Sequence, residues 1–73
     1  MIEIYGKSGC SGCSEAKQLC EMKGVSYKYL TLGSDYQLKE FLEVSGGKHK
    51  SFPMITYDGN YLGGLQELKN ILK

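Results

Sequence analysis

The sequence has few of the features that are typical of proteins that bind nucleic acid, enter a membrane or are secreted. Nine Lys and Arg residues nearly balance eight Asp and Glu residues, for a formal net charge of +1, so no overall field draws the chain to nucleic acid or to an anionic membrane. No apolar run approaches the ~18 residues of a membrane span. The start, MIEIYGKSG, lacks the basic and apolar regions of a secretory signal. We therefore expect a cytoplasmic protein that binds neither nucleic acid nor a membrane.

Length, proline and cysteine are limited as well. With 73 residues the chain is near the lower limit at which a hydrophobic core alone supports folding. There is one Pro, and no low-complexity run or break in composition suggests a linker. Three cysteines are too few, and odd in number, for a disulfide-stapled secreted scaffold. We predict one domain over residues 1–73 and expect it to be monomeric.

The first half of the chain predicts a strand, a helix and a strand. Residues 1–5 form a short β-branched stretch that Gly6 ends. A helical pattern follows, with Ser11 as its expected N-cap and Gly24 as its expected C-cap. Residues 26–32 alternate as a second strand. This spacing is typical of a right-handed βαβ unit with parallel strands.

The second half predicts a helix, a hairpin and a helix. Ser34 or Asp35 is the expected N-cap of a helix that stops at Gly46, and Asp58-Gly59 predicts a tight hairpin within residues 54–64. The expected apolar stripes are Leu38, Phe41 and Leu42 in this helix, and Leu65, Leu68, Ile71 and Leu72 in a last helix over residues 65–73. The predicted order is βαβαββα, an α/β fold with a mixed four-stranded sheet and helices on both faces.

The stretch CSGC places Cys10 and Cys13 where the first strand passes into the first helix. Unpaired backbone N–H groups and the positive end of the helix dipole favour a thiolate there, and Lys7 adds a positive charge nearby. Two intervening residues bring the sulfur atoms close enough to bond, with Cys13 expected to be less exposed. We predict a Cys10 pKa below that of a free thiol. Cys10 then attacks a substrate disulfide, and Cys13 displaces the product to leave a Cys10–Cys13 bond.

A metal site is the alternative use of these cysteines. It would combine Cys10 and Cys13 with Cys20 and His49, but the spacing is irregular and has no second CxxC. Cys20 also fits the buried stripe of the first helix, where a free cysteine behaves as a small hydrophobe. His49 lies between two lysines in GGKHKS, which predicts a solvated basic loop. We therefore favour a redox pair and predict no metal site.

Taken together, the residues resemble the glutaredoxins of the thioredoxin superfamily. The resemblance covers the first strand with Lys7 and the cysteine pair, the helix pattern CSEAKQLC, SFP at residues 51–53 and YLGGLQEL. It implies a thioredoxin-like fold and a glutathione-dependent thiol-disulfide oxidoreductase that reduces protein disulfides or glutathione mixed disulfides. It further implies that glutathione is the reductant, that no cofactor is tightly bound, and that a disulfide-bearing protein such as a ribonucleotide reductase is a client.

The resemblance also implies a glutathione site. A cis peptide would precede Pro53, and the backbone of Phe52 would pair with the cysteinyl part of glutathione. Lys7 would meet the glycine carboxylate, with Lys39 or Lys50 as further candidates, while the diglycine turn would hold the γ-glutamyl end. Ser11-Gly12 replaces the family's Pro-Tyr, and Gln66 stands where an acidic residue is common. The predicted glutathione-binding residues are Lys7, Ser11, Gly12, Phe52, Pro53, Gly63, Gly64 and Gln66.

Two alternatives stay open at this point. One is a redoxin reduced by thioredoxin reductase, which needs no glutathione groove and which the diglycine in YLGGLQEL disfavours. The other is a binding module that uses its cysteines for a metal or an iron-sulfur cluster. Some relatives with Ser at the position of Ser11 hold such a cluster between two subunits together with glutathione.

Overall fold

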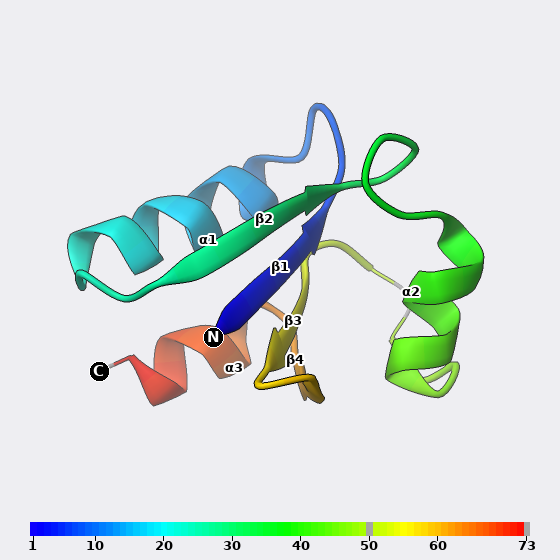
Figure 1. Ribbon diagram of the computed structural model, residues 1–73. Coiled ribbons are helices and arrows are strands. Elements are labelled where there is room, and N and C mark those ends of the chain that lie inside the picture. Colours follow the sequence, from blue (N-terminus) through cyan, green and yellow to red (C-terminus); the bar gives the residue numbers. More distant parts are fainter. Residues whose placement is uncertain (50, 73) are drawn as a thin grey trace.

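The computed structural model describes residues 1–49 and 51–72 and confirms the predicted order of elements (Figure 1). The strands are β1 (Ile2–Gly6), β2 (Tyr27–Thr31), β3 (Met54–Tyr57) and β4 (Asn60–Gly63), and the helices are α1 (Ser11–Met22), α2 (Leu38–Ser45) and α3 (Leu65–Ile71). Lys50 and Lys73, which the sequence predictions included, lie outside the described residues.

The sheet is mixed and four-stranded, as predicted, with the strand order β2-β1-β3-β4. β1 pairs in parallel with β2 and antiparallel with β3, so Ile4 lies between Tyr29 and Ile55. β3 and β4 form the expected hairpin. Its turn residues Asp58 and Gly59 have φ angles of 52° and 84°, the left-handed conformation that a two-residue hairpin turn requires.

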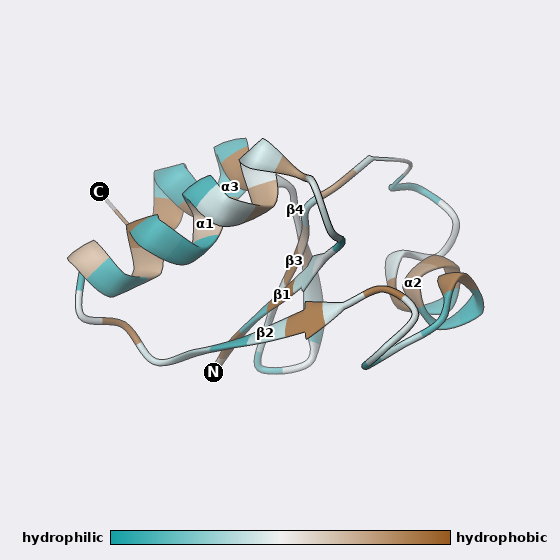
Figure 2. Cartoon of the chain, turned by 90° about the horizontal axis from the view of Figure 1, so that it is seen from above, coloured by the Kyte–Doolittle hydropathy of each residue, from teal (hydrophilic) through white to brown (hydrophobic). Residues whose placement is uncertain are grey.

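Helices cover both faces of the sheet. Figure 2 shows α1 and α3 side by side on one face and α2 on the other. Because neighbouring strand residues point to opposite faces, Ile55 joins the core beneath α1 and α3 while Met54 joins the core beneath α2. The first core consists of Ile2, Ile4, Ala16, Cys20, Ile55 and Leu68, and the second of Tyr36, Phe41 and Met54.

The start of α2 differs from the prediction. Gln37 is its N-cap, not Ser34 or Asp35. The Asp35 carboxylate instead accepts a hydrogen bond at 2.8 Å from the backbone N–H of Thr31, which closes the turn after β2. The chain therefore enters the helix later, although the helix stops as predicted at Gly46, whose φ is 65°.

Two of the predicted apolar stripes are wrong in part. In α2, Phe41 is 1% exposed, but Leu38 and Leu42 are 52% and 43% exposed. In α3, Leu68 is buried but Ile71 is 44% exposed. α2 lies alone on its side of the sheet among the described residues (Figure 2), so only one narrow face of this eight-residue helix is covered.

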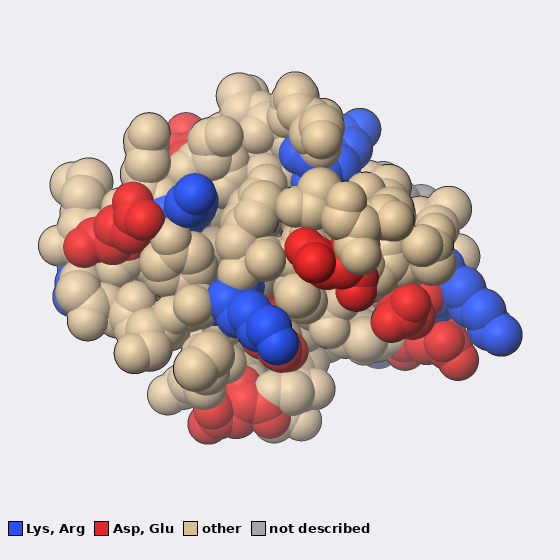
Figure 3. Space-filling model, turned by 45° about the horizontal axis from the view of Figure 1, so that its top comes forward, with Lys and Arg blue, Asp and Glu red and all other residues tan. Residues whose placement is uncertain are grey.

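The surface carries charges of both signs. On the face that Figure 3 displays, lysines and acidic residues are interspersed among wide uncharged areas, in keeping with the formal net charge of +1. The described residues include no helix with the length and apolar character needed to cross a lipid bilayer.

Candidate active site

The CSGC stretch forms the start of α1. Cys10 is the N-cap, with an extended backbone, and its Sγ accepts the backbone N–H of Cys13 at 3.1 Å. Ser11, which the sequence predicted as the cap, is the first residue of the helix instead. The N–H groups of a first helical turn have no partners within the helix, and the dipole is positive there. A negative charge on the Cys10 sulfur is therefore stabilised where it sits.

The two cysteines are bonded to each other, with their Cα atoms 5.3 Å apart. Cys13 is fully buried and Cys10 is partly exposed. This confirms the prediction that Cys13 is the less accessible of the two. A reagent or substrate arriving from solvent therefore meets the sulfur of Cys10 first.

The loop before β3 faces the cysteine pair. The Phe52–Pro53 peptide bond is cis, as the family resemblance implied. Gly12 lies directly against this loop: a Cβ added to it would be 3.3 Å from Cδ of Pro53 and 3.9 Å from the carbonyl oxygen of Phe52. The structure thus brings Gly12, Phe52 and Pro53 together beside the disulfide.

Lys7 lies in the loop between β1 and α1, near both Phe52 and Cys10. Its Nζ is 5.0 Å from the centroid of the Phe52 ring, within the range of a cation–π contact. It also lines a pocket beside Cys10. The prediction that Lys7 lies near the cysteines is therefore confirmed.

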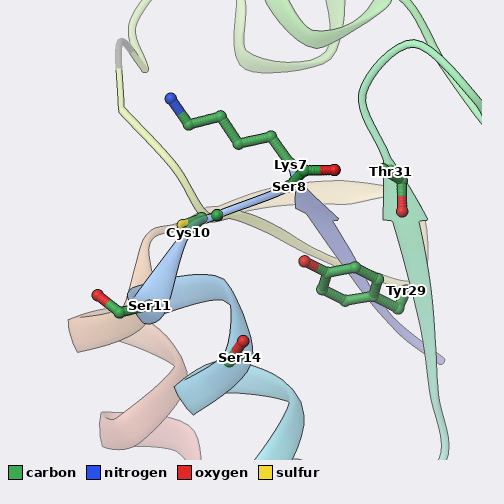
Figure 4. A pocket seen from close by; sticks show the side chains of 8 residues that line it. Lys7, Ser8, Cys10, Ser11, Ser14, Tyr29 and Thr31 are labelled. Carbon is green, nitrogen blue, oxygen red and sulfur yellow. The ribbon is translucent and has the colours of Figure 1, made fainter.

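That pocket opens on the β2 side of Cys10, whereas Pro53 lies on the β3 side. It has a volume of about 460 Å³ and is rich in hydroxyl groups (Figure 4). The close-up shows Ser11 and Ser14 on α1 and Tyr29 and Thr31 on β2. The pocket is lined by Lys7, Ser8, Gly9, Cys10, Ser11, Ser14, Tyr29 and Thr31. The sequence analysis did not include Ser14, although it directly follows Cys13 on α1. It also missed Tyr29 and Thr31, because only the pairing of β2 with β1 brings that strand beside the cysteines.

The diglycine joins β4 to α3, because Gly63 is the last residue of the strand and Gly64 precedes the first residue of the helix. Gly64 is the N-cap, and its backbone N–H donates to Oε1 of Glu67 at 2.7 Å. This hydrogen bond is the main reason that the pKa of Glu67 is lowered. A Cβ on Gly63 would lie 2.6 Å from Cγ of Glu67, so the folded-back side chain requires glycine there. Glu67 turns back over the diglycine, while Gln66, the predicted glutathione contact, is exposed beside it.

His49 lies at the site, although the sequence predicted it in a solvated loop. It is half-buried, and its ring nitrogens lie 3.1 Å from the carbonyl oxygen of Pro53 and 2.9 Å from the hydroxyl of Tyr61. The prediction of a solvated loop is therefore wrong at this residue. A lone His between two lysines carries no local signal of such partners, since Tyr61 is twelve residues away in the chain.

The cysteines are not arranged as a metal centre in the part of the chain that the structure describes. No three His, Cys, Asp or Glu side chains among those residues are placed to hold a metal ion. Cys20 is fully buried in the core beneath α1, and burial raises its thiol pKa. The nitrogens of His49 are directed to Pro53 and Tyr61.

These features define a class of protein. A mixed sheet between helices, an accessible cysteine at a helix N-terminus, a buried partner cysteine three residues on and a cis-proline opposite them are the parts of a thiol-disulfide oxidoreductase with a thioredoxin-like fold. The sequence model of the family "Glutaredoxin" matches residues 2–62. The chain belongs to the glutaredoxin family.

Sequence relatives agree with this assignment. Glutaredoxin 1 of Rickettsia prowazekii is 32% identical over 74 residues, which cover 99% of this chain and 77% of that protein. The hybrid peroxiredoxin hyPrx5 of Haemophilus influenzae is 35% identical over 68 residues. That match covers 93% of this chain but only 27% of the peroxiredoxin, so the likeness is to one part of a longer protein.

Solved structures share the fold. Glutaredoxin 1 from Francisella tularensis, complexed with cacodylate, is 28% identical with a TM-score of 0.74, covering 94% of this chain and 87% of that one. Reduced Escherichia coli glutaredoxin has a TM-score of 0.82 at 23% identity, covering 97% and 91%. A buckwheat glutaredoxin–glutathione complex has a TM-score of 0.78 at 20% identity, covering 94% and 64%. The last two comparisons bear on the fold alone.

Proposed function

We propose that this glutaredoxin uses glutathione as its reductant and acts on glutathione mixed disulfides and protein disulfides. The observation that carries the proposal is the Cys10 sulfur at the start of α1, accepting the N–H of Cys13 at 3.1 Å beside the Phe52–Pro53 loop. A thiolate at this position is both stabilised and reachable. The family supplies the expectation of glutathione, and the buckwheat relative was solved with it.

The reaction on a glutathione mixed disulfide needs only Cys10. Its thiolate attacks the glutathione sulfur, forms a Cys10–glutathione disulfide and releases the substrate as a thiolate. A second glutathione thiolate then attacks the bound glutathione sulfur. Cys10 leaves as a thiolate, and the two glutathione molecules are released as one oxidised glutathione.

A protein disulfide uses both cysteines. Cys10 attacks one sulfur, and the other substrate sulfur leaves as a thiolate. Cys13, once deprotonated, attacks the Cys10 sulfur, and the bond observed here forms as the second substrate thiolate departs. Two glutathione molecules restore the two thiols and become one oxidised glutathione.

The glutathione-binding residues remain proposals that the local geometry supports. The proposal that the backbone of Phe52 pairs with the cysteinyl part is supported by Gly12 of the CSGC stretch, which lies against this loop. Lys7, beside Phe52, offers its charge to the glycine carboxylate. The γ-glutamyl end would lie at the diglycine and Gln66, and the backbone at Ser11 and Gly12 would form the near wall. The proposed set is Lys7, Ser11, Gly12, Phe52, Pro53, Gly63, Gly64 and Gln66.

We place this activity in the cytoplasm, where the thiol pool is kept reduced, with the protein acting as a monomer and without a tightly bound cofactor. A ribonucleotide reductase is the proposed protein client. One observation favours a second reductant, a thioredoxin reductase. The Gly64 N–H already donates to Glu67 at 2.7 Å, so it is engaged before any glutathione carboxylate arrives.

A single comparison tests the proposal and its rival. Turnover of a glutathione mixed disulfide is measured with glutathione and glutathione reductase, then with thioredoxin reductase, for wild type, Cys10→Ser and Cys13→Ser. We expect activity with glutathione that Cys10→Ser abolishes and Cys13→Ser retains. Reduction of a protein disulfide, measured in parallel with glutathione and glutathione reductase, should be lost in Cys13→Ser. Activity with thioredoxin reductase alone would favour the rival. Inactivity with both reductants would overturn the assignment of reductant altogether.

A further inference from the structure

His49 connects four parts of the molecule that surround the cysteine pair. Its Nε2 lies 3.1 Å from the carbonyl oxygen of Pro53, and its Nδ1 lies 2.9 Å from the hydroxyl of Tyr61 on β4. The ring centroid is 5.9 Å from that of Phe41 on α2. A Cβ on Gly64, at the start of α3, would be 3.2 Å from Cε1 of His49. One imidazole thus meets the cis-proline loop, the hairpin, α2 and the diglycine.

The partners of the two ring nitrogens determine where its proton lies. A backbone carbonyl oxygen can only accept a hydrogen bond, so Nε2 must carry a hydrogen to bond Pro53. In the neutral imidazole Nδ1 is then an acceptor, and the Tyr61 hydroxyl donates to it. Tyr61 therefore stabilises the tautomer that directs an N–H at Pro53.

The bonded carbonyl belongs to the part of the loop that faces the site. Pro53 is buried, and a Cβ added to Gly12 would lie 3.3 Å from Cδ of its ring. Phe52 is linked to His49 a second time through Phe41, because the Phe41 and Phe52 ring centroids are 4.8 Å apart. A displacement of the imidazole would reach the backbone at Pro53 through the hydrogen bond and the Phe52 side chain through the aromatic rings.

We propose that His49, in the tautomer set by Tyr61, is a positioning residue for the substrate groove, holding the Phe52–Pro53 backbone at the place where it meets a glutathione moiety bound to Cys10. The inference rests on the proposed function, in which the Phe52 backbone pairs with the cysteinyl part of glutathione. His49 acts through Pro53 and does not touch the reacting sulfur atoms.

Kinetics separate this role from a purely structural one. His49→Ala should raise KM for the glutathione mixed disulfide about three- to tenfold, the range for one lost hydrogen bond. Alkylation of reduced Cys10 by iodoacetamide should not change, since this small probe needs no groove. His49→Gln should recover part of the loss, because its amide can donate to Pro53. Tyr61→Phe should give a smaller rise in KM. Tyr57→Phe, which changes a more exposed tyrosine on the same hairpin, should give none.

A spectroscopic measurement tests the proton's position without any activity. The chain contains one His, so its imidazole ¹⁵N resonances are unambiguous. We expect a protonated Nε2 and an unprotonated Nδ1 in neutral wild-type protein, and a mixture of tautomers in Tyr61→Phe.

Two results would overturn the inference. One is an Nδ1–H tautomer in the wild type, and the other is an unchanged KM in folded His49→Ala. If His49→Ala does not fold, an unchanged KM and an unchanged tautomer in Tyr61→Phe would have the same force. Failure of the wild type to use glutathione would instead overturn the proposed function, while the resonances would still report on the Pro53 bond.

Discussion

The hydroxyl of Tyr36 donates a hydrogen bond at 2.8 Å to the carbonyl oxygen of Gly6, thirty residues away in the chain. Gly6 is the last residue of β1, directly before the loop that leads to Cys10. Tyr36 is 3% exposed, and burial is the main cause that raises its pKa to about 12. This bond fixes the segment between β2 and α2 to the base of the active site.

Removing that hydroxyl should weaken the fold measurably. Tyr36→Phe is expected to lower the free energy of unfolding by about 1 kcal/mol, the usual net value of one hydrogen bond. Urea unfolding measures it. Tyr57→Phe is the control, because Tyr57 is 52% exposed and should change stability by less than ~0.5 kcal/mol. Equal effects of the two substitutions would show that the buried bond adds no stability.

The raised pKa of Tyr36 predicts that the stability of the fold falls at alkaline pH. Because folding raises the pKa of Tyr36 from 10.0 to about 12, its contribution is complete below pH 10 and is lost as the pH rises toward 12. The difference in thermal midpoint between wild type and Tyr36→Phe should therefore shrink across this window. The other tyrosines titrate in both proteins and cancel in the difference. A gap that stays constant to pH 12 would contradict the prediction.

The lowered pKa of Glu67 predicts that the stability of the fold falls at acidic pH. Its pKa is lowered below 4.5, chiefly by the hydrogen bond from the Gly64 N–H. The stability that its charge adds is present above pH 4.5 and is lost as the pH falls through the lowered value. Glu67→Gln should thus melt below wild type at pH 7 and together with it in strong acid. Glu43→Gln, an exposed substitution on α2, should melt at a constant offset from wild type at both pH values. If the difference in melting temperature between Glu67→Gln and wild type does not shrink in acid, the capping role of Glu67 is refuted.

The small core beneath α2 should depend on one side chain. Phe41 is 1% exposed and contacts the rings of both His49 and Phe52. Phe41→Ala is expected to cost about 3–5 kcal/mol, a large share of the ~5–15 kcal/mol that holds a typical domain folded. Leu42→Ala, next to it and 43% exposed, should cost under about 1 kcal/mol. Chemical denaturation of the two variants checks this, and a similar loss in both would be inconsistent with the packing.

Cys10 should be the reactive thiol of the reduced protein. Its sulfur lies at the N-terminus of α1, whereas Cys20 is buried with a raised pKa. With limiting iodoacetamide at neutral pH, mass spectrometry of peptides should find Cys10 labelled at least about tenfold faster than Cys20. The labelling rate of Cys10 should fall as the pH drops below its thiolate pKa. Labelling no faster than that of a simple peptide thiol would remove the basis of the mechanism.

Part of the active site could be predicted from the sequence. The cysteine pair, Lys7 and the diglycine are short patterns whose chemistry follows from local position. Glu67 and His49 were missed because their importance comes from what they fold against: Glu67 caps the N–H of Gly64, and His49 meets a hairpin residue and a loop carbonyl.

The sequence by itself determined the order of the elements, the tight turn at Asp58-Gly59 and the location of Cys10 at a helix start, because each depends on near neighbours in the chain. Only the tertiary structure decided that Leu38 is exposed while Phe41 is covered, and that Tyr29 lines the pocket beside the disulfide. The reason is physical. Periodicity specifies which side of an element is apolar, but burial and contact depend on which distant segments pack against that side.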